Sequence, residues 1–154
     1  MTRHRRVALL DVNVVVALFD PDHVHHEVAH DWFADHRARG WATCPLTENG
    51  FLRTAIALSR GRGREPVGAA ELSDAFRAFT SSGHHEFWQD SVSLLDDDLI
   101  AAEQVTGHQQ LTDVYLLALA VKHKGVLATF DRRVPIGAVK GARREHVELL
   151  APAG

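Results

Sequence analysis

The sequence predicts an α/β fold in which a mainly parallel sheet is covered by helices on both faces. Short apolar runs alternate with longer segments of helical periodicity, which is the pattern of parallel strands joined by helical crossovers. Residues 111–123 are apolar nearly all round, as expected of a helix buried against a sheet. With 154 residues, 45% of them hydrophobic, the chain can bury a sizeable core, and we expect one domain over residues 1–154.

The first forty residues predict one strand and two helices. Residues 7–10 form an uninterrupted aliphatic run and predict a buried strand, and residues 14–19 predict a short helix. Apolar residues recur at helical spacing over residues 23–39, which predicts an amphipathic helix that ends at Gly40.

The middle of the chain predicts two further strands and two helices. Residues 41–44 predict a strand and residues 47–58 a helix. Residues 59–68, rich in glycine and arginine, predict a loop before a helix over residues 69–80. A short strand is expected at residues 85–89.

The last third completes the alternation. The apolar helix at residues 111–123 precedes a predicted strand at residues 125–130, and residues 146–150 predict the last strand. Each predicted strand is thus joined to the next by a segment long enough for a crossover.

Composition excludes several classes of protein. The formal net charge of −3 argues against a nucleic-acid binder that relies on bulk positive charge. Cys44 is the one cysteine, which excludes an internal disulfide and a cysteine-rich zinc site. Asp11 and Asn13 interrupt the first apolar run, which is also too short to span a bilayer, since spanning needs about 20 apolar residues. We therefore expect a soluble, cytoplasmic protein.

Two acidic residues directly follow predicted strands. Asp11 comes after residues 7–10, and Asp131 comes after residues 125–130. In open α/β sheets, sites form at the carboxyl ends of the strands, so both carboxylates are expected at that edge.

Two more acidic residues stand where helices are expected to begin. In "LTENGFL" Glu48 follows Thr47, and in "LTDVYLL" Asp113 follows Thr112. We expect each threonine to be the N-cap and each acid to be the first helical residue. Helices of right-handed crossovers begin near the edge where the preceding strand ended, so all four acids are expected to converge.

Each acid alone has a simple explanation, as a partner of a helix dipole or as a turn residue. Four carboxylates at one edge would repel one another unless protons or a cation intervened, and oxygen ligands suit Mg²⁺ or Mn²⁺. A divalent cation would also explain why the carboxylate of Asp11 is tolerated inside an apolar run.

These residues resemble those of the PIN-domain ribonucleases, and among them the VapC-type toxins of bacterial toxin–antitoxin pairs. The resemblance runs nearly end to end and is carried by the segments "LLDVNVVVAL", "CPLTENGFLR", "GHQQLTDVYLLALAVKHKGVLATFDRR" and "VELL". It implies a three-layer α/β/α fold, a homodimer and inhibition by a cognate VapB-type antitoxin. The implied activity is Mg²⁺-dependent endonucleolytic cleavage of structured RNA, such as tRNA or rRNA, by metal-activated water.

The resemblance also assigns roles to individual residues. The catalytic acids it implies are Asp11, Glu48, Asp113 and Asp131. Of these, Asp11, Asp113 and Asp131 are expected to bind the metal, while Glu48 positions the attacking water. Polar positions that support these acids match Asn13 and Thr129.

Basic residues could bring RNA to so acidic a site. Candidate phosphate contacts follow Asp131 in the sequence, and the alternative is an ordinary solvated tail; they are Arg132, Arg133, Lys140, Arg143 and Arg144. A weaker candidate group lies in the glycine-rich loop and comprises Arg60, Arg62 and Arg64. His26 and His30 have a spacing that can bind a transition metal, but a solvated helix face is the favoured interpretation.

Two other functions remain open at this point. "DVNVV" after a strand is similar to the start of the haloacid-dehalogenase phosphatases, although Asn13 stands where their second acid belongs. A non-catalytic binding module with the same fold is the other possibility. The presence of all four acids favours catalysis.

Overall fold

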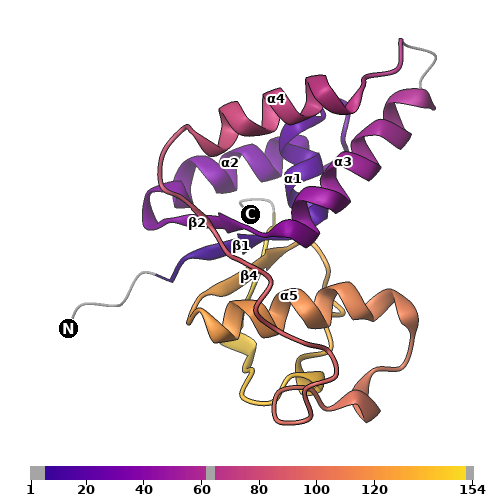
Figure 1. The fold of residues 1–154 in the computed structure, drawn as a ribbon. Coiled ribbons are helices and arrows are strands. Elements are labelled where there is room, and N and C mark those ends of the chain that lie inside the picture. The colour runs from indigo at the N-terminus through magenta and orange to yellow at the C-terminus, as the bar shows by residue number, and fades with distance from the viewer. Residues whose placement is uncertain (1–5, 62–64, 152–154) are drawn as a thin grey trace.

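The computed structural model describes residues 6–61 and 65–151, and its core is a parallel sheet (Figure 1). The strands pair in the order β3-β2-β1-β4-β5, and every neighbouring pair is parallel. Their bounds are Ala8–Leu10 (β1), Trp41–Thr43 (β2), His85–Phe87 (β3), Val126–Thr129 (β4) and Val147–Leu149 (β5). The predicted sheet is confirmed.

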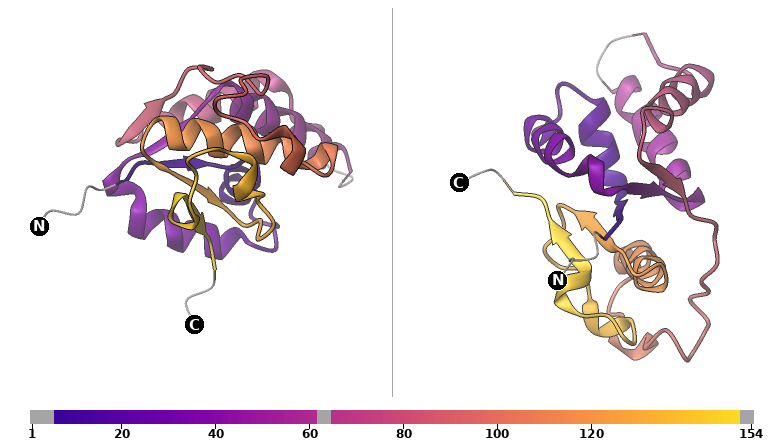
Figure 2. Two further views of the ribbon diagram at one scale, coloured as in Figure 1. Left: turned by 90° about the horizontal axis from the view of Figure 1, so that it is seen from below. Right: turned by 90° about the vertical axis from the view of Figure 1, so that its left-hand side faces the viewer.

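Helices cover both faces of this sheet. Helices α1 to α4 lie on one face and α5 on the other, which gives the expected three layers (Figures 1 and 2). Their bounds are Val12–Phe19 (α1), His26–His36 (α2), Pro45–Arg60 (α3), Ala69–Thr80 (α4) and Leu111–Lys122 (α5). Short 3-10 helices occupy Arg37–Arg39 (η1), Ala102–Gln104 (η2), His108–Gln110 (η3), Ile136–Ala138 (η4) and Arg144–His146 (η5).

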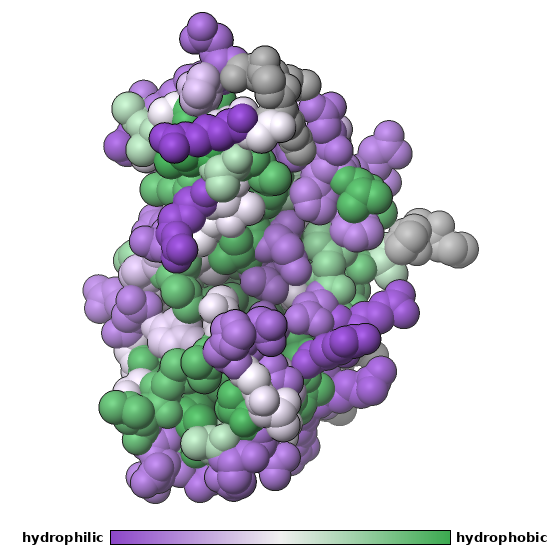
Figure 3. Space-filling view, turned by 90° about the vertical axis from the view of Figure 1, so that its right-hand side faces the viewer, coloured by the Kyte–Doolittle hydropathy of each residue, from purple (hydrophilic) through white to green (hydrophobic). Residues whose placement is uncertain are grey.

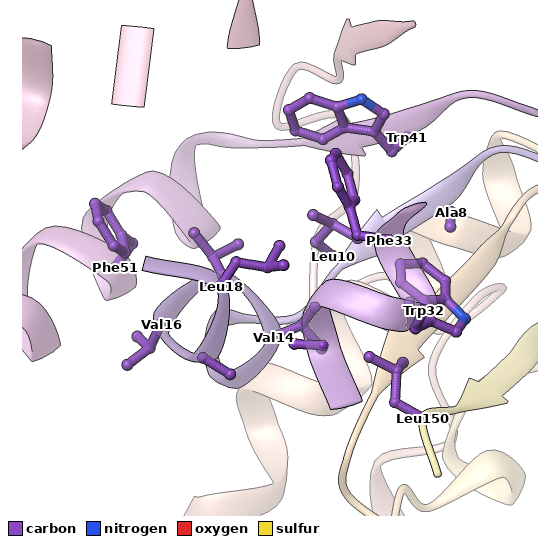
Figure 4. Close-up of a cluster of buried hydrophobic side chains, with 14 of the residues drawn as sticks. Ala8, Leu10, Val14, Val16, Leu18, Trp32, Phe33, Trp41, Phe51 and Leu150 are labelled. Atoms are coloured by element: carbon purple, nitrogen blue, oxygen red, sulfur yellow. The ribbon is translucent and has the colours of Figure 1, made fainter. Parts of the chain in front are cut away.

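The two faces have separate cores. Under α1 to α4 the core is rich in aromatic residues; Phe33 meets Trp41 edge to face, with ring centroids 5.2 Å apart (Figure 4). Around α5 it is mainly aliphatic, because Leu116, Leu117 and Leu119 are buried on successive sides of one helix. This explains why residues 111–123 lack a polar stripe.

Helix α3 begins earlier than its predicted range, whereas α5 begins at residue 111 as predicted; the N-cap predictions for Thr47 and Thr112 are wrong. Cys44 is the N-cap of α3, because Pro45 suits the first helical position, and Thr47 instead accepts a hydrogen bond from the Cys44 N–H at 2.9 Å. The 3-10 helix η3 runs directly into α5, which leaves Gln110 as the N-cap.

The helix predicted over residues 23–39 is also shorter. Hydrogen-bonded turns occupy residues 20–25, α2 begins at His26, and its last turn tightens into η1. Helix α1 begins at Val12 rather than residue 14, because Asp11 caps it.

Close packing between α3 and α1 depends on Gly50. A Cβ atom at this position would lie 2.5 Å from Cγ2 of Val12, the residue after Asp11. The first turns of α3 can therefore approach the start of α1 only because residue 50 has no side chain.

No helix within residues 6–61 and 65–151 is both long and apolar enough to cross a membrane. Of the predicted basic loop residues, Arg62 and Arg64 lie outside the described residues.

Candidate active site

Asp11 occupies the junction between β1 and α1 and is 5% exposed. Its Oδ1 accepts a hydrogen bond from the Val12 N–H at 2.7 Å, and its Oδ2 accepts one from the Thr129 hydroxyl at 2.6 Å. Burial raises the pKa of Asp11 and outweighs these two donors, which lower it. The carboxyl group is thus held in one orientation at the carboxyl end of the central strand.

Thr129 links Asp11 to Asp131. The threonine is fully buried at the end of β4, and its hydroxyl also accepts a hydrogen bond from the Asp131 N–H at 3.0 Å. The Oδ1 of Asp131 accepts a further hydrogen bond from the Arg133 N–H at 2.8 Å. One buried hydroxyl therefore holds the carboxyl group of Asp11 and the backbone of Asp131 at the ends of neighbouring strands.

Asp113 is the third aspartate of the site. It lies on the first turn of α5, on the face of the sheet opposite α1. Burial, a hydrogen bond with the Asp131 carboxyl group, and repulsion from Asp11 and Asp131 raise the pKa of Asp113 to about 8. Without a cation, this carboxyl group therefore carries a proton at neutral pH and shares it with Asp131.

These three aspartates line one cleft of about 640 Å³ together with Asn13. Asn13 lies on the first turn of α1, and its buried Oδ1 has no hydrogen-bond partner in the part of the chain that the structure describes. Buried amide oxygens are normally satisfied, so this atom is a free acceptor beside the carboxyl groups. The cleft opens at the carboxyl edge of the sheet, and Figure 3 shows hydrophilic surface next to hydrophobic surface on that side.

Glu48 is the one predicted acid that is not among the residues lining this cleft. It sits near the start of α3, and burial raises its pKa. The cleft is not lined by Glu48, and within the described chain its carboxyl group makes no hydrogen bond or ion pair. The structure thus brings together three of the four predicted acids.

The basic residues divide between the two edges of the sheet. Arg132 and Arg133 directly follow Asp131 and are exposed beside the cleft. Arg143 and Arg144 precede β5, and because all strands are parallel they lie at the opposite, amino edge. Arg6, which precedes β1, contacts Glu145 there. The expectation that Arg143 and Arg144 lie beside the acids is therefore wrong.

Three other expected basic or histidine residues have structural partners. Lys140 donates to the Asp97 carbonyl oxygen at 2.7 Å. His26 and His30 contact the carbonyl oxygens of Ala17 and Leu18 through ring nitrogens, at 2.7 and 2.9 Å, at the carboxyl end of α1. A carbonyl oxygen only accepts, so these nitrogens carry protons. The histidines cap another helix, which their spacing in the sequence could not reveal.

The donor set suits a hydrated divalent cation. In the described ranges, no three His, Cys, Asp or Glu side chains form a ready-made metal site. Mg²⁺, however, keeps several of its waters and needs only one or two carboxylates from the protein. Asp11, Asp113 and Asp131, with the unpaired Asn13 oxygen, offer hard oxygen donors whose mutual repulsion a cation would relieve. The residues present therefore fit the metal that the sequence resemblance implies.

The cleft also has lining residues that the sequence did not single out. Val24, Leu58 and Gln109 come from the α1–α2 connection, α3 and η3. No spacing rule connects these three positions, so only the folded chain reveals that they share a cleft with the aspartates.

Comparisons with known proteins agree on the kind of fold. A family model described as the PIN domain matches residues 8–140. The solved structure of PAE2754 from Pyrobaculum aerophilum is similar, with a TM-score of 0.53 and 25% identity, over 90% of this chain and 83% of that one.

Curated relatives are similar over most of their length. Ribonuclease VapC44 of Mycobacterium tuberculosis is 44% identical over 143 residues, which cover 93% of this chain and 99% of the relative. Ribonuclease VapC39 of the same organism is 40% identical over 134 residues, covering 87% and 95% respectively.

Proposed function

Because the chain belongs to the PIN domain family, and within it to the VapC-type ribonucleases, we propose that it is a metal-dependent endoribonuclease and the toxin of a toxin–antitoxin pair. The observation that supports this most directly is the meeting of Asp11, Asp113 and Asp131, from three separate segments, in one cleft. The family match gives no support to a haloacid-dehalogenase phosphatase.

We assign the acids to cation binding. Asp11 would hold a Mg²⁺ or Mn²⁺ ion with Asp113 and Asp131, directly or through water, and family membership implies a divalent metal. When bound, such an ion lowers the pKa of a water and stabilises negative charge on a phosphate. Thr129 and the Val12 N–H keep Asp11 oriented, while Asp113 must release its proton to ligate.

Glu48 is proposed to position the attacking water, and this role rests on the sequence resemblance alone. Asn13 is proposed to support the site, because it lines the same cleft and its buried amide oxygen has no partner among the described residues. Arg132 and Arg133 are the basic residues that we propose as phosphate contacts, since they are exposed beside Asp131.

Partners and substrate follow from the relatives. The VapC name implies an RNA substrate and a VapB-type antitoxin, and we propose both for this chain, together with a homodimer, cytoplasmic action and structured RNA such as tRNA or rRNA as the target. Sequencing the new RNA ends after brief induction in cells identifies the target. If overexpression of the wild type slows growth no more than overexpression of Asp11→Asn does, the toxin assignment is contradicted.

Purified protein tests the chemistry. We expect cleavage of single-stranded or loop RNA with Mg²⁺ or Mn²⁺, none in EDTA, and a loss of at least about a hundredfold in kcat/KM for Asp11→Asn. Attack by water leaves 5′-phosphate and 3′-hydroxyl ends. Activity that persists in EDTA, or 2′,3′-cyclic phosphate ends, would show that the 2′-hydroxyl attacks instead. A folded, inactive wild type that still binds RNA would favour the binding-module alternative.

A further inference from the structure

The loop between α1 and α2 holds an apolar side chain at the rim of the acidic cleft. Val24 lines the cleft and is 84% exposed. The turn that carries it is closed by its own hydrogen bonds: the His23 N–H donates to the Asp20 carbonyl oxygen, and the His25 N–H donates to Nδ1 of His23, both at 3.0 Å. Val24 is therefore presented from a defined turn rather than from a loose loop.

A ring contact fixes this turn to the site. His25 stacks on Phe130, with centroids 4.6 Å apart and planes 19° apart, and Phe130 directly precedes Asp131. The stacked pair places Val24 at a set position relative to the strand end that carries the acid.

Leu58 and Gln109 line the same cleft from two other elements. Leu58 lies near the end of α3 and is 36% exposed, and the exposed Gln109 lies in η3, four residues before Asp113. The cleft thus combines carboxyl groups with two partly exposed apolar side chains and a primary amide, and its other polar lining residues include Asp22, His23 and Thr54. A single exposed apolar residue is ordinary, but two from separate elements in one cleft with charged groups are less so.

This combination matches the parts of a nucleotide. The phosphate belongs with the acids and their cation, whereas a nucleobase has apolar faces and a polar edge that an amide can read. A base is covalently attached within a few ångströms of its phosphate, so a site beside the aspartates is reached by a flanking base.

We propose that Val24, Leu58 and Gln109 form a nucleobase subsite that receives an unpaired base next to the scissile phosphate. Val24 and Leu58 contact the face of the base, and Gln109 hydrogen-bonds to its edge. The inference rests on the proposed ribonuclease function and adds to it the feature of the RNA that the cleft selects: an unstacked base rather than duplex shape.

The test uses full-length protein and a short single-stranded RNA that it cleaves, with and without the base on either side of the cut. Val24→Ser should raise KM roughly tenfold on the intact RNA, with little change in kcat, because loss of a buried aliphatic contact of this size costs on that scale. Removing the flanking base should cost the wild type a similar factor. On that abasic RNA, Val24→Ser and wild type should then have equal KM values.

Matched variants separate this subsite from general surface effects. Leu95→Ser removes another apolar side chain, 91% exposed and outside the cleft, and should leave KM unchanged on both RNAs. Gln109→Ala should make the protein less selective: the ratio of kcat/KM between the best and the worst base at the flanking position should fall roughly tenfold.

Three results would overturn the subsite. One is a KM increase for Val24→Ser that is as large on abasic RNA as on intact RNA. The second is no change for Val24→Ser and Gln109→Ala on either RNA. The third is a change in solution mass or antitoxin affinity without a change in KM, which would mean that a protein covers Val24. A wild type that cleaves neither RNA is a different failure, because it refutes the ribonuclease function itself.

Discussion

At the amino edge of the sheet and on β5 beside it, two glutamates pair with arginines, whereas at the carboxyl edge Asp11, Asp113 and Asp131 share one cleft. Glu148 on β5 accepts hydrogen bonds from Arg39 at 2.6 Å and from the Trp32 indole at 2.7 Å, and Arg6 pairs with Glu145 at 3.7 Å. Asp113 can share the carboxyl edge only by holding a proton. The fold thus pairs opposite charges at one edge and gathers like charges at the other, where a cation would relieve their repulsion.

The largest expected difference between the edges is their response to Mg²⁺. The ion should stabilise the wild type by about 2.7 kcal/mol at a hundred times its dissociation constant, and Asp113→Asn much less. In EDTA the variant should be at least as stable as the wild type, because it removes one repelling carboxyl group. Thermal melting across a Mg²⁺ series measures both effects. An equal Mg²⁺ shift in the two proteins, with Asp113→Asn melting well below wild type in EDTA, would make the acid structural.

Removing an ion pair at the amino edge should destabilise the protein by an amount that does not depend on Mg²⁺. Glu148→Ala leaves the indole of Trp32 and the guanidinium of Arg39, whose Nε already lacks a partner, without their acceptor. We expect a loss of about 1–3 kcal/mol in urea unfolding, equal in EDTA and in Mg²⁺. Glu145→Ala is the control at the same edge, since its exposed pair with Arg6 is worth at most about 1 kcal/mol. If the loss of stability in Glu148→Ala depended on Mg²⁺, the two edges would not differ in their response to the ion.

The stability of the metal-free protein should depend on pH through the carboxyl edge, because Asp113 lies there. The pKa of Asp113 is about 8 in the folded protein and has an ordinary value of 3.8. Between these values the folded state retains a proton that the unfolded state has released, so metal-free wild type loses stability as pH rises from about 4 to about 8. Asp113 is only partly buried, so solvent screening reduces the effect. Urea unfolding in EDTA should show the advantage of Asp113→Asn over wild type growing across this range; a constant difference would contradict the raised pKa.

The smallest expected effect concerns RNA binding. Arg132→Ala and Arg133→Ala should each lower the salt slope of binding to a short single strand by about 0.7, because each removes one phosphate contact. Arg143→Ala and Arg144→Ala, at the amino edge, are the matched controls and should leave the slope unchanged. Titrations at several salt concentrations measure this. Equal losses in all four variants would show that RNA reaches both edges.

Much of the fold was predictable because its signals are local. Helix α4 matches its predicted bounds, Ala69–Thr80, since its apolar spacing and flanking loop are both explicit in the sequence. The strands that carry Asp11 and Asp131 are uninterrupted aliphatic runs. Once both were expected in one parallel sheet, the meeting of their acids followed from topology.

The errors have different origins. Arg143 and Arg144 directly precede the strand predicted at residues 146–150, and in a parallel sheet that position is the amino edge, so the sequence already held this information. His26 and His30 bond to carbonyl groups of another helix, and the 3-10 helix before α5 displaced the expected cap at Thr112. The partners of His26 and His30 thus lie in another helix, whereas η3 directly precedes Thr112.

Gly50 has a consequence for any systematic mutational survey of this protein. In alanine scanning, substitution normally deletes atoms and so tests what a side chain contributes. At position 50 alanine adds an atom, and that atom would meet Cγ2 of Val12 at 2.5 Å. The change would push the start of α3 away from Asp11 while leaving every acidic residue in place. A loss of activity in Gly50→Ala would therefore show that activity depends on the spacing between α1 and α3. A survey restricted to charged and polar positions would not include position 50.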